Sequence, residues 1–196
     1  STAGQLLARF WDVESGSISI GGKDIRDYST KALMNTVAFV FQDTYIFAES
    51  VYDNIAMHQN VTQEAVEYAA KAARCHDFIQ ALPEGYHTKL GDGGHKLSGG
   101  EAQRIAIARA ILKNAPIVVL DEAMAFTDAE NELALREGMA ELLKGKTVLM
   151  IAHRLYSIQD ADMIFVLENG RLKESGTHKD LLQKHGLYAH LWDIQN

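Results

Sequence analysis

Apolar runs of strand length that alternate with helical segments are the feature that most constrains how this chain can fold. Ile117–Leu120 is a continuous apolar run, which is typical of a strand buried on both faces of a parallel sheet. Thr147–Ala152 and Met163–Leu167 predict two further buried strands, while Glu101–Lys113 and Asp128–Leu143 have helical periodicity. Strands separated by helices indicate βαβ units, so we expect an α/β fold with a parallel sheet.

The first half of the chain predicts a less regular mixture of elements. The whole sequence contains only two prolines, and no Gly/Ser-rich linker marks a domain boundary. Periodicity and turn signals divide this half into five segments. These are helix Gln5–Trp11, strand Gly16–Ile20, strand Thr36–Phe41, helix Val61–Leu82 and a glycine-rich loop at Gly91–Gly94.

The composition excludes several classes of protein. With 47% hydrophobic and 23% charged residues, the chain of 196 residues resembles a globular domain, not a disordered or fibrous protein. The net charge of −7 argues against a nucleic-acid-binding module, which needs a basic surface. The longest apolar stretches are far shorter than the ~20 residues that span a bilayer. A single cysteine, Cys75, cannot form an internal disulfide and fits a reducing compartment.

Polar side chains follow three of the predicted strands. Gln42 follows the first strand, Asp121 and Glu122 follow the central apolar run, and His153 follows Thr147–Ala152. In parallel sheets ligands bind beyond the carboxyl ends of the strands, so this pattern predicts a site there. The alternative is a strand that ends in solvent, where the two acids only cap the next helix.

The segment Leu-Ser-Gly-Gly-Glu that ends at Glu101 predicts a helix start that can bind an anion. Ser98 is a favourable N-cap, and Glu101 three residues later completes a capping-box pattern. Gly99 and Gly100 leave backbone amides open to close approach, and free amides at a helix start commonly bind phosphate. The alternative is an ordinary capped helix without a ligand.

These motifs together resemble the nucleotide-binding domain of ATP-binding cassette (ABC) transporters, over essentially all 196 residues. The resemblance implies a P-loop NTPase-like parallel sheet core with an α-helical signature subdomain at about residues 61–111. The matching positions are the signature motif Leu97–Glu101, the Walker B strand Ile117–Glu122, the Q-loop Gln42, the switch His153, the D-loop Asp128 and the exporter-type contact loop Thr88–Gly94.

The resemblance also implies that the domain is partial at its start. Ser1 and Thr2 match the last residues of the family's phosphate-binding loop, with Ser1 at the Mg²⁺-binding hydroxyl. The lysine and glycines of that loop, and an N-terminal antiparallel β portion, would then precede Ser1. We therefore expect that residues 1–196 alone form an inactive fragment that does not hold ATP.

By the family's pattern, the cofactors are ATP and Mg²⁺. Asp121 would hold Mg²⁺ through water, with Ser1 and Gln42 also at the metal, and Gln42 near the attacking water. Glu122 would be the general base, and His153 would contact the γ-phosphate.

The resemblance implies two protein partners and no nucleic acid. Ser98, Gly99, Gly100 and Glu101 would close over ATP that is bound to a second nucleotide-binding domain in a head-to-tail dimer, with Asp128 at the same interface. A transmembrane domain would contact the residues after the Q-loop, Tyr45–Phe47 among them. The expected location is the cytoplasmic face of the cell inner membrane.

Two other functions stay open on the sequence. The chain can be read as a non-transport ABC ATPase of the kind that acts in DNA repair or translation. The contact loop and the segment Gly176–Leu182, which is similar to the exporter C-terminal Gly-Thr-His-x-x-Leu-Leu pattern, argue against that class. The second is the inactive fragment described above. The transported substrate, its direction and the choice between homodimer and heterodimer are not readable from these residues.

Overall fold

The computed structural model describes residues 2–41, 43–121 and 129–195. Its contacts divide the chain into two compact units, residues 1–151 and residues 152–196, and each unit is described by itself below. Among the described residues, no helix is both long enough and apolar enough to cross a membrane.

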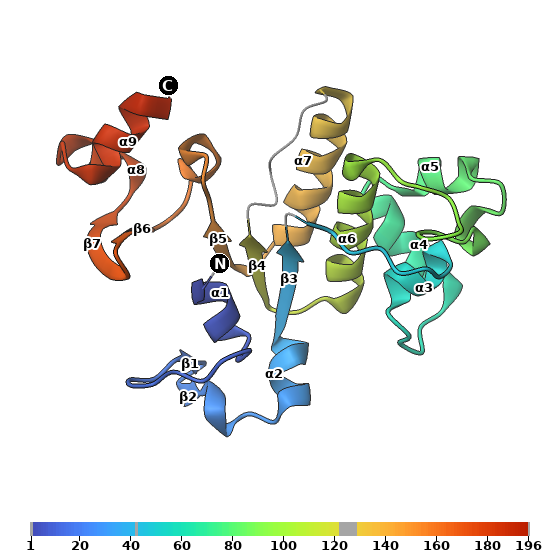
Figure 1. Cartoon of the computed structure of the whole chain (residues 1–196), viewed down its shortest axis with the longest axis horizontal. Coiled ribbons are helices and arrows are strands. Elements are labelled where there is room, and N and C mark those ends of the chain that lie inside the picture. The colour runs from blue at the N-terminus through green and yellow to red at the C-terminus, as the bar shows by residue number, and fades with distance from the viewer. Residues whose placement is uncertain (1, 42, 122–128, 196) are drawn as a thin grey trace. The chain divides into compact units, whose positions relative to one another are not determined.

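A three-stranded parallel sheet organises the first unit (Figure 1). It consists of β3 (Val37–Phe41), β4 (Ile117–Asp121) and β5 (Thr147–Ile151), in the order β3-β4-β5. Both pairings are parallel, and the register places Phe41, Asp121 and Ile151 side by side at the carboxyl edge. The predicted α/β fold with a parallel sheet is therefore confirmed.

Helices cover both faces of this sheet because the central strand is apolar on both sides. Val118 and Leu120 pack into the larger core with helices α6 (Gly99–Lys113) and α7 (Ala129–Leu143), while Val119 packs on the opposite face. This alternation follows from the two-residue period of a strand. The helices of the larger core are α3 (Val51–Ala56), α4 (Gln63–Ala72), α5 (His76–Ala81), α6 (Gly99–Lys113) and α7 (Ala129–Leu143), with a 3₁₀ turn at Gly85–His87.

The opposite face of the sheet is covered by shorter elements. These are α1 (Thr2–Leu7), the hairpin of β1 (Ser19–Ile20) and β2 (Lys23–Asp24), a 3₁₀ turn at Ile25–Asp27, and α2 (Thr30–Thr36). Helix α1 lies close to the sheet at Gly4. A Cβ there would stand 3.1 Å from Cγ1 of Val119 and 3.4 Å from Cδ1 of Ile151, so only glycine allows this approach without a shift.

The second unit is an antiparallel hairpin followed by two helices. A 3₁₀ turn at Leu155–Ile158 comes first, and strands β6 (Ile164–Glu168) and β7 (Arg171–Gly176) then pair with each other. Helices α8 (His178–Gln183) and α9 (Leu187–Gln195) follow β7. Its small core contains Leu155, Ile164, Val166, Leu181 and Tyr188.

The prediction that Met163–Leu167 is a buried strand of the parallel sheet is wrong. The strand pairs antiparallel with β7, which the sequence reading did not identify, and its residues alternate between buried and exposed up to Leu167. The physical reason is the two-residue turn Asn169-Gly170, in which both residues have positive φ angles of 50° and 72°. Asn-Gly in that conformation is a strong hairpin signal, and it was available in the sequence.

Four other predicted elements differ from the structure. Of the strand predicted at Gly16–Ile20, only Ser19–Ile20 forms a strand. The single helix predicted over residues 61–82 is two helices, α4 and α5, because the chain breaks where Arg74 takes a left-handed φ of 57°. The first helix begins and ends earlier than predicted, because Arg9 also has a positive φ. Strand β5 is more exposed than predicted, since it is an edge strand of the described sheet.

Candidate functional site

The carboxyl edge of the sheet is where the sequence predicts a site. Asp121 is the last residue of β4 and lies level with Phe41 and Ile151. The register therefore brings three strand ends together, and polar residues follow each of them along the chain. Four predicted site residues, which are Ser1, Gln42, Glu122 and Asp128, lie outside the described residues, so their roles stay predictions.

His153 belongs to the second unit, and its backbone is held there by a residue that the sequence reading missed. The carbonyl of His153 accepts a hydrogen bond of 2.9 Å from Nε2 of Gln195. Oε1 of the same side chain accepts one of 2.9 Å from the backbone N–H of Leu155. The C-terminal end of α9 thus fixes the chain on both sides of residue 154. No local signal could have found Gln195, because 42 residues separate it from His153.

The predicted helix start at Ser98 is confirmed as a capping box. Oγ of Ser98 accepts a hydrogen bond of 3.3 Å from the backbone N–H of Glu101. The backbone N–H of Ser98 donates one of 2.8 Å to Oε2 of Glu101. These reciprocal bonds fix the direction in which α6 begins.

The start of α6 is open to a ligand. Ser98 and Gly99 are exposed, and a Cβ added at Gly99 would meet nothing within 4 Å. The first-turn amides of a helix have no partner within the helix and carry its positive partial charge. This end of α6 therefore presents backbone donors to which an anion can come close.

Helix α6 runs antiparallel to β3, so its start faces the same way as the strand ends. Near its beginning, Nε2 of Gln103 donates a 3.2 Å hydrogen bond to the carbonyl of Phe41, the last residue of β3. At its end, Nζ of Lys113 donates one of 2.8 Å to the carbonyl of Val37, the first residue of β3. At 1.5 Å per residue, Ser98 lies about 7 Å beyond Gln103, past the level of the strand's end.

Thr2 is the first residue of α1, and Gly4 brings this helix against Ile151 at the carboxyl end of β5. The described groups near the strand ends are therefore the Asp121 carboxylate and the Thr2 hydroxyl, while the exposed amides at the start of α6 face the same way. Amides at a helix start suit phosphate, and Mg²⁺ takes one or two carboxylates together with waters and substrate phosphates. Within the described part of the chain no cluster of three or more His, Cys, Asp or Glu residues could hold a metal alone. The described carboxylate and the helix-start amides are groups of the kinds that contact a Mg²⁺–nucleotide.

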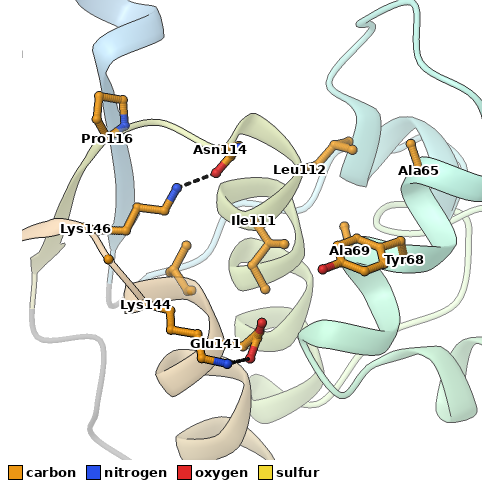
Figure 2. Close-up of a pocket in the computed structure, with 12 residues that line it drawn as sticks. Ala65, Tyr68, Ala69, Ile111, Leu112, Asn114, Pro116, Glu141, Lys144 and Lys146 are labelled. Atoms are coloured by element: carbon orange, nitrogen blue, oxygen red, sulfur yellow. Dashed lines mark hydrogen bonds and ion pairs between the residues drawn. The ribbon is translucent and has the colours of Figure 1, made fainter.

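A cavity of about 730 Å³ lies elsewhere, among α4, α6 and α7 (Figure 2). Lys144 pairs with Glu141 at 3.2 Å, and Lys146 donates a hydrogen bond to Asn114 at its rim. Lys146 directly precedes β5, so this cavity is at the amino edge of the sheet, away from Asp121. Both lysines follow the end of α7, where positive charge complements the helix dipole. The cavity is therefore separate from the candidate site.

Comparisons with known proteins agree with this geometry. The family model described as "ABC transporter" matches residues 1–125. A Bacillus subtilis protein named "Putative multidrug export ATP-binding/permease protein YgaD" is 48% identical over all of this chain, which covers 34% of that relative. A Staphylococcus aureus protein described in the same terms is 47% identical with the same coverage.

A solved structure gives the same result in three dimensions. The structure described as a bacterial Atm1-family ABC exporter with ATP bound matches 99% of this chain with a TM-score of 0.90 and 43% identity, and the match covers 34% of that chain. The chain thus spans about a third of the length of the relatives that it matches. On the family model, the sequence identity and the shared fold, this chain belongs to the ABC transporter family.

Proposed function

We propose that this chain is the ATP-binding and ATP-hydrolysing part of an exporter-type ABC transporter, and that it powers transport across a membrane. The observation that carries the proposal is the level alignment of Phe41, Asp121 and Ile151, with the open start of α6 pointing the same way. The similarity to ATP-binding/permease proteins and to an ATP-bound exporter supports the same conclusion.

In this proposal the residues after the strand ends divide the work of phosphoryl transfer to water. Asp121, with Gln42 and Ser1, would hold Mg²⁺, which when bound neutralises charge on the phosphates. Glu122 would take a proton from the attacking water. His153 would donate to the γ-phosphate, and Gln195 would hold its backbone in place.

The start of α6 would serve a nucleotide on a second copy of the domain. Ser98, Gly99, Gly100 and Glu101 would close over ATP on the opposing subunit of a head-to-tail dimer, with Asp128 at the same interface. The exposure of Ser98 and Gly99 supports this arrangement, because donors aimed away from their own fold can reach a partner's ligand.

A transmembrane domain would be the other partner, and the site would work at the cytoplasmic face of the inner membrane. Tyr45 is 70% exposed and Phe47 36% exposed, with ring centroids 4.8 Å apart, so this pair offers an apolar contact. Residues 61–111 would form the helical signature subdomain. The net charge of −7 supports the expectation that nucleic acid is not a partner.

The sharpest test of the mechanism is Glu122→Gln in the transporter that contains this chain. ATP turnover should fall by ~10²–10⁴-fold, the range for loss of a general base, while Mg·ATP binding is kept. Glu137→Gln is the matched control, since Glu137 is a half-exposed residue of α7 that forms an ion pair with Arg74. Unchanged turnover in Glu122→Gln would remove that residue from the role of base.

A Mg·ATP titration tests whether residues 1–196 bind nucleotide without a preceding phosphate-binding loop. We compare this chain with a version extended by that loop. Binding by the extended form only supports the prediction that residues 1–196 alone are inactive. Equal binding by both would contradict the assignment of Ser1 and Thr2 to the end of the loop.

A further inference from the structure

The exposed aromatic pair, Tyr45 and Phe47, lies on a segment whose backbone is held by buried and half-buried polar side chains. Residues Thr44–Phe47 follow β3, and the ring of Tyr45 is largely exposed. Loops of this kind are usually mobile when few of their backbone groups are bonded to the rest of the protein. Here three polar side chains from two helices bond to this segment and to the end of β3.

Asn54 on α3 supplies the first set of these bonds. Its side chain is fully buried, with 0% exposure. Oδ1 accepts a 2.9 Å hydrogen bond from the backbone N–H of Phe47, and Nδ2 donates one of 3.0 Å to the carbonyl of the same residue. Nδ2 also donates to the carbonyl of Ser50 at 3.0 Å. The amide group therefore holds both polar groups of the Phe47 backbone.

Arg109 on α6 supplies the second set. Nη1 donates a 2.7 Å hydrogen bond to the carbonyl of Tyr45, and Nη2 donates one of 2.7 Å to Oδ1 of Asn54. Nε donates to the backbone carbonyl of Asn54, and the guanidinium stands 5.6 Å from the centroid of the Phe47 ring. Burial lowers the pKa of Arg109 to about 10, which still leaves it charged at neutral pH.

Gln103, also on α6, holds the other end of the segment. Its side chain is buried, and Nε2 donates to the carbonyl of Phe41. Oε1 accepts a 2.8 Å hydrogen bond from the hydroxyl of Thr44. Gln103 and Arg109 are six residues apart, or about 9 Å along the helix axis, so α6 is bonded to this segment at two separated points.

A purely stabilising role does not account for this arrangement. Arg109 is half-buried, and a single hydrogen bond from its guanidinium would be enough to stabilise the fold locally. What the planar guanidinium supplies is geometry, because its fixed donors bond to acceptors in two different elements at once. For Arg109 the two acceptors are the backbone carbonyl of Tyr45 and the side-chain oxygen Oδ1 of Asn54.

We propose that Gln103 and Arg109 are positioning residues that make the Thr44–Phe47 segment and helix α6 move as one body. Ser98 is the N-cap of this same 15-residue helix, so a displacement of the helix start would carry the aromatic pair with it. Asn54 completes the connection by holding Phe47. The inference rests on the proposed function, because it is nucleotide binding that would displace the start of α6.

The test is hydrogen–deuterium exchange on the solubilised transporter that contains this chain, with and without Mg²⁺ and the non-hydrolysable analogue AMP-PNP. Two peptides are followed, one over residues 98–104 and one over residues 45–50. In the wild type the nucleotide should change exchange in both peptides. In Arg109→Lys, which keeps the charge but loses the planar fork, the change over 98–104 should persist and the change over 45–50 should disappear.

The same variant should show faster exchange at Phe47 without nucleotide. Loss of charge-assisted hydrogen bonds should speed local opening there by roughly tenfold. Arg74→Lys is the matched control, because Arg74 is an exposed arginine that pairs with Glu137 at 2.9 Å. It should leave both peptides as in the wild type.

The outcomes separate this inference from the proposed function. If the nucleotide changes neither peptide in the wild type, the proposed function fails, and the inference fails with it. If the nucleotide changes exchange in both peptides equally in the wild type and in Arg109→Lys, only the inference is overturned. The inference is also overturned if, in the wild type, the nucleotide changes exchange over residues 98–104 alone. Should Arg109→Lys not fold, Gln103→Met carries the test, because it keeps the side-chain length but loses the bonds to Phe41 and Thr44.

Discussion

Gly99→Ala should separate function from stability at the start of α6. A Cβ at this position meets no atom within 4 Å, so the substitution creates no clash within the chain. The new methyl group would instead occupy the open space from which an anion approaches the helix-start amides. We expect the transporter's ATP turnover to fall at least about tenfold, and up to the ~10²-fold that follows loss of one transition-state donor.

The stability of the same variant should not fall. Alanine is favoured over glycine by up to about 1 kcal/mol inside a helix, and by less in the first turn. For a chain of 196 residues this corresponds to a rise in Tm of between zero and about 4 °C. Thermal unfolding of residues 1–196, followed by circular dichroism, measures this difference.

Gly145→Ala is the matched control with the opposite profile. Gly145 also has open space around its Cβ position, but its φ is +67°. Alanine in that left-handed conformation costs about 1–2 kcal/mol, which lowers Tm by roughly 2–8 °C. Gly145 lies between α7 and β5, at the amino edge of the sheet, so the turnover of the folded transporter should be kept.

Two results would refute this reasoning. Full ATP turnover in Gly99→Ala would show that no ligand approaches the start of α6 at this glycine. A clear drop in Tm for Gly99→Ala would show that the position is constrained by the fold itself. In that case its loss of activity would say nothing about a phosphate contact.

Three further predictions concern stability and reactivity. Burial raises the pKa of Cys75 to about 12, so its thiol should react with a disulfide reagent at pH 8.5 only as fast as the chain unfolds. The free energy of unfolding should fall as the pH rises from about 9 toward 12, because in that range the unfolded chain loses the thiol proton and the folded chain keeps it. Glu174→Gln should lower the free energy of unfolding in urea by about 1 kcal/mol, because the Glu174 carboxylate accepts from the backbone N–H groups of Leu187 and Tyr188 at the start of α9. Asn54→Ala should lower the free energy of unfolding by about 3–5 kcal/mol in the same assay, since the backbone groups of Phe47 and Ser50 lose their partner; a loss below 1 kcal/mol would contradict the network.

Local patterns in the sequence predicted the elements that carry the site. The apolar run before Asp121 predicted β4, and the Ser98–Glu101 pattern predicted the capping box that begins α6. Such signals depend on backbone geometry within a few residues, so no knowledge of the rest of the fold is needed. The missed hairpin at Asn169-Gly170 belongs to the same class, because its turn signal is also local.

Other features could not be predicted because they depend on which distant segments meet. Gln195 bonds to the backbone of His153 across 42 residues, and Arg109 bonds to Asn54 across 55. A glutamine or an arginine on a helix has no sequence signal that names its acceptor. The break between α4 and α5 is similar, since nothing in the periodicity of residues 61–82 marks Arg74 as left-handed.

The sequence by itself determined the α/β class, the strands β3, β4 and β5 of the parallel sheet, the chemical groups that follow them and the family to which they point. Only the tertiary structure decided that Phe41, Asp121 and Ile151 are level, that α6 runs antiparallel to β3, and that Gln103 and Arg109 join this helix to Thr44–Phe47. The physical reason is range. Secondary structure and capping follow from neighbouring residues, whereas buried hydrogen bonds form wherever packing leaves a donor and an acceptor without water.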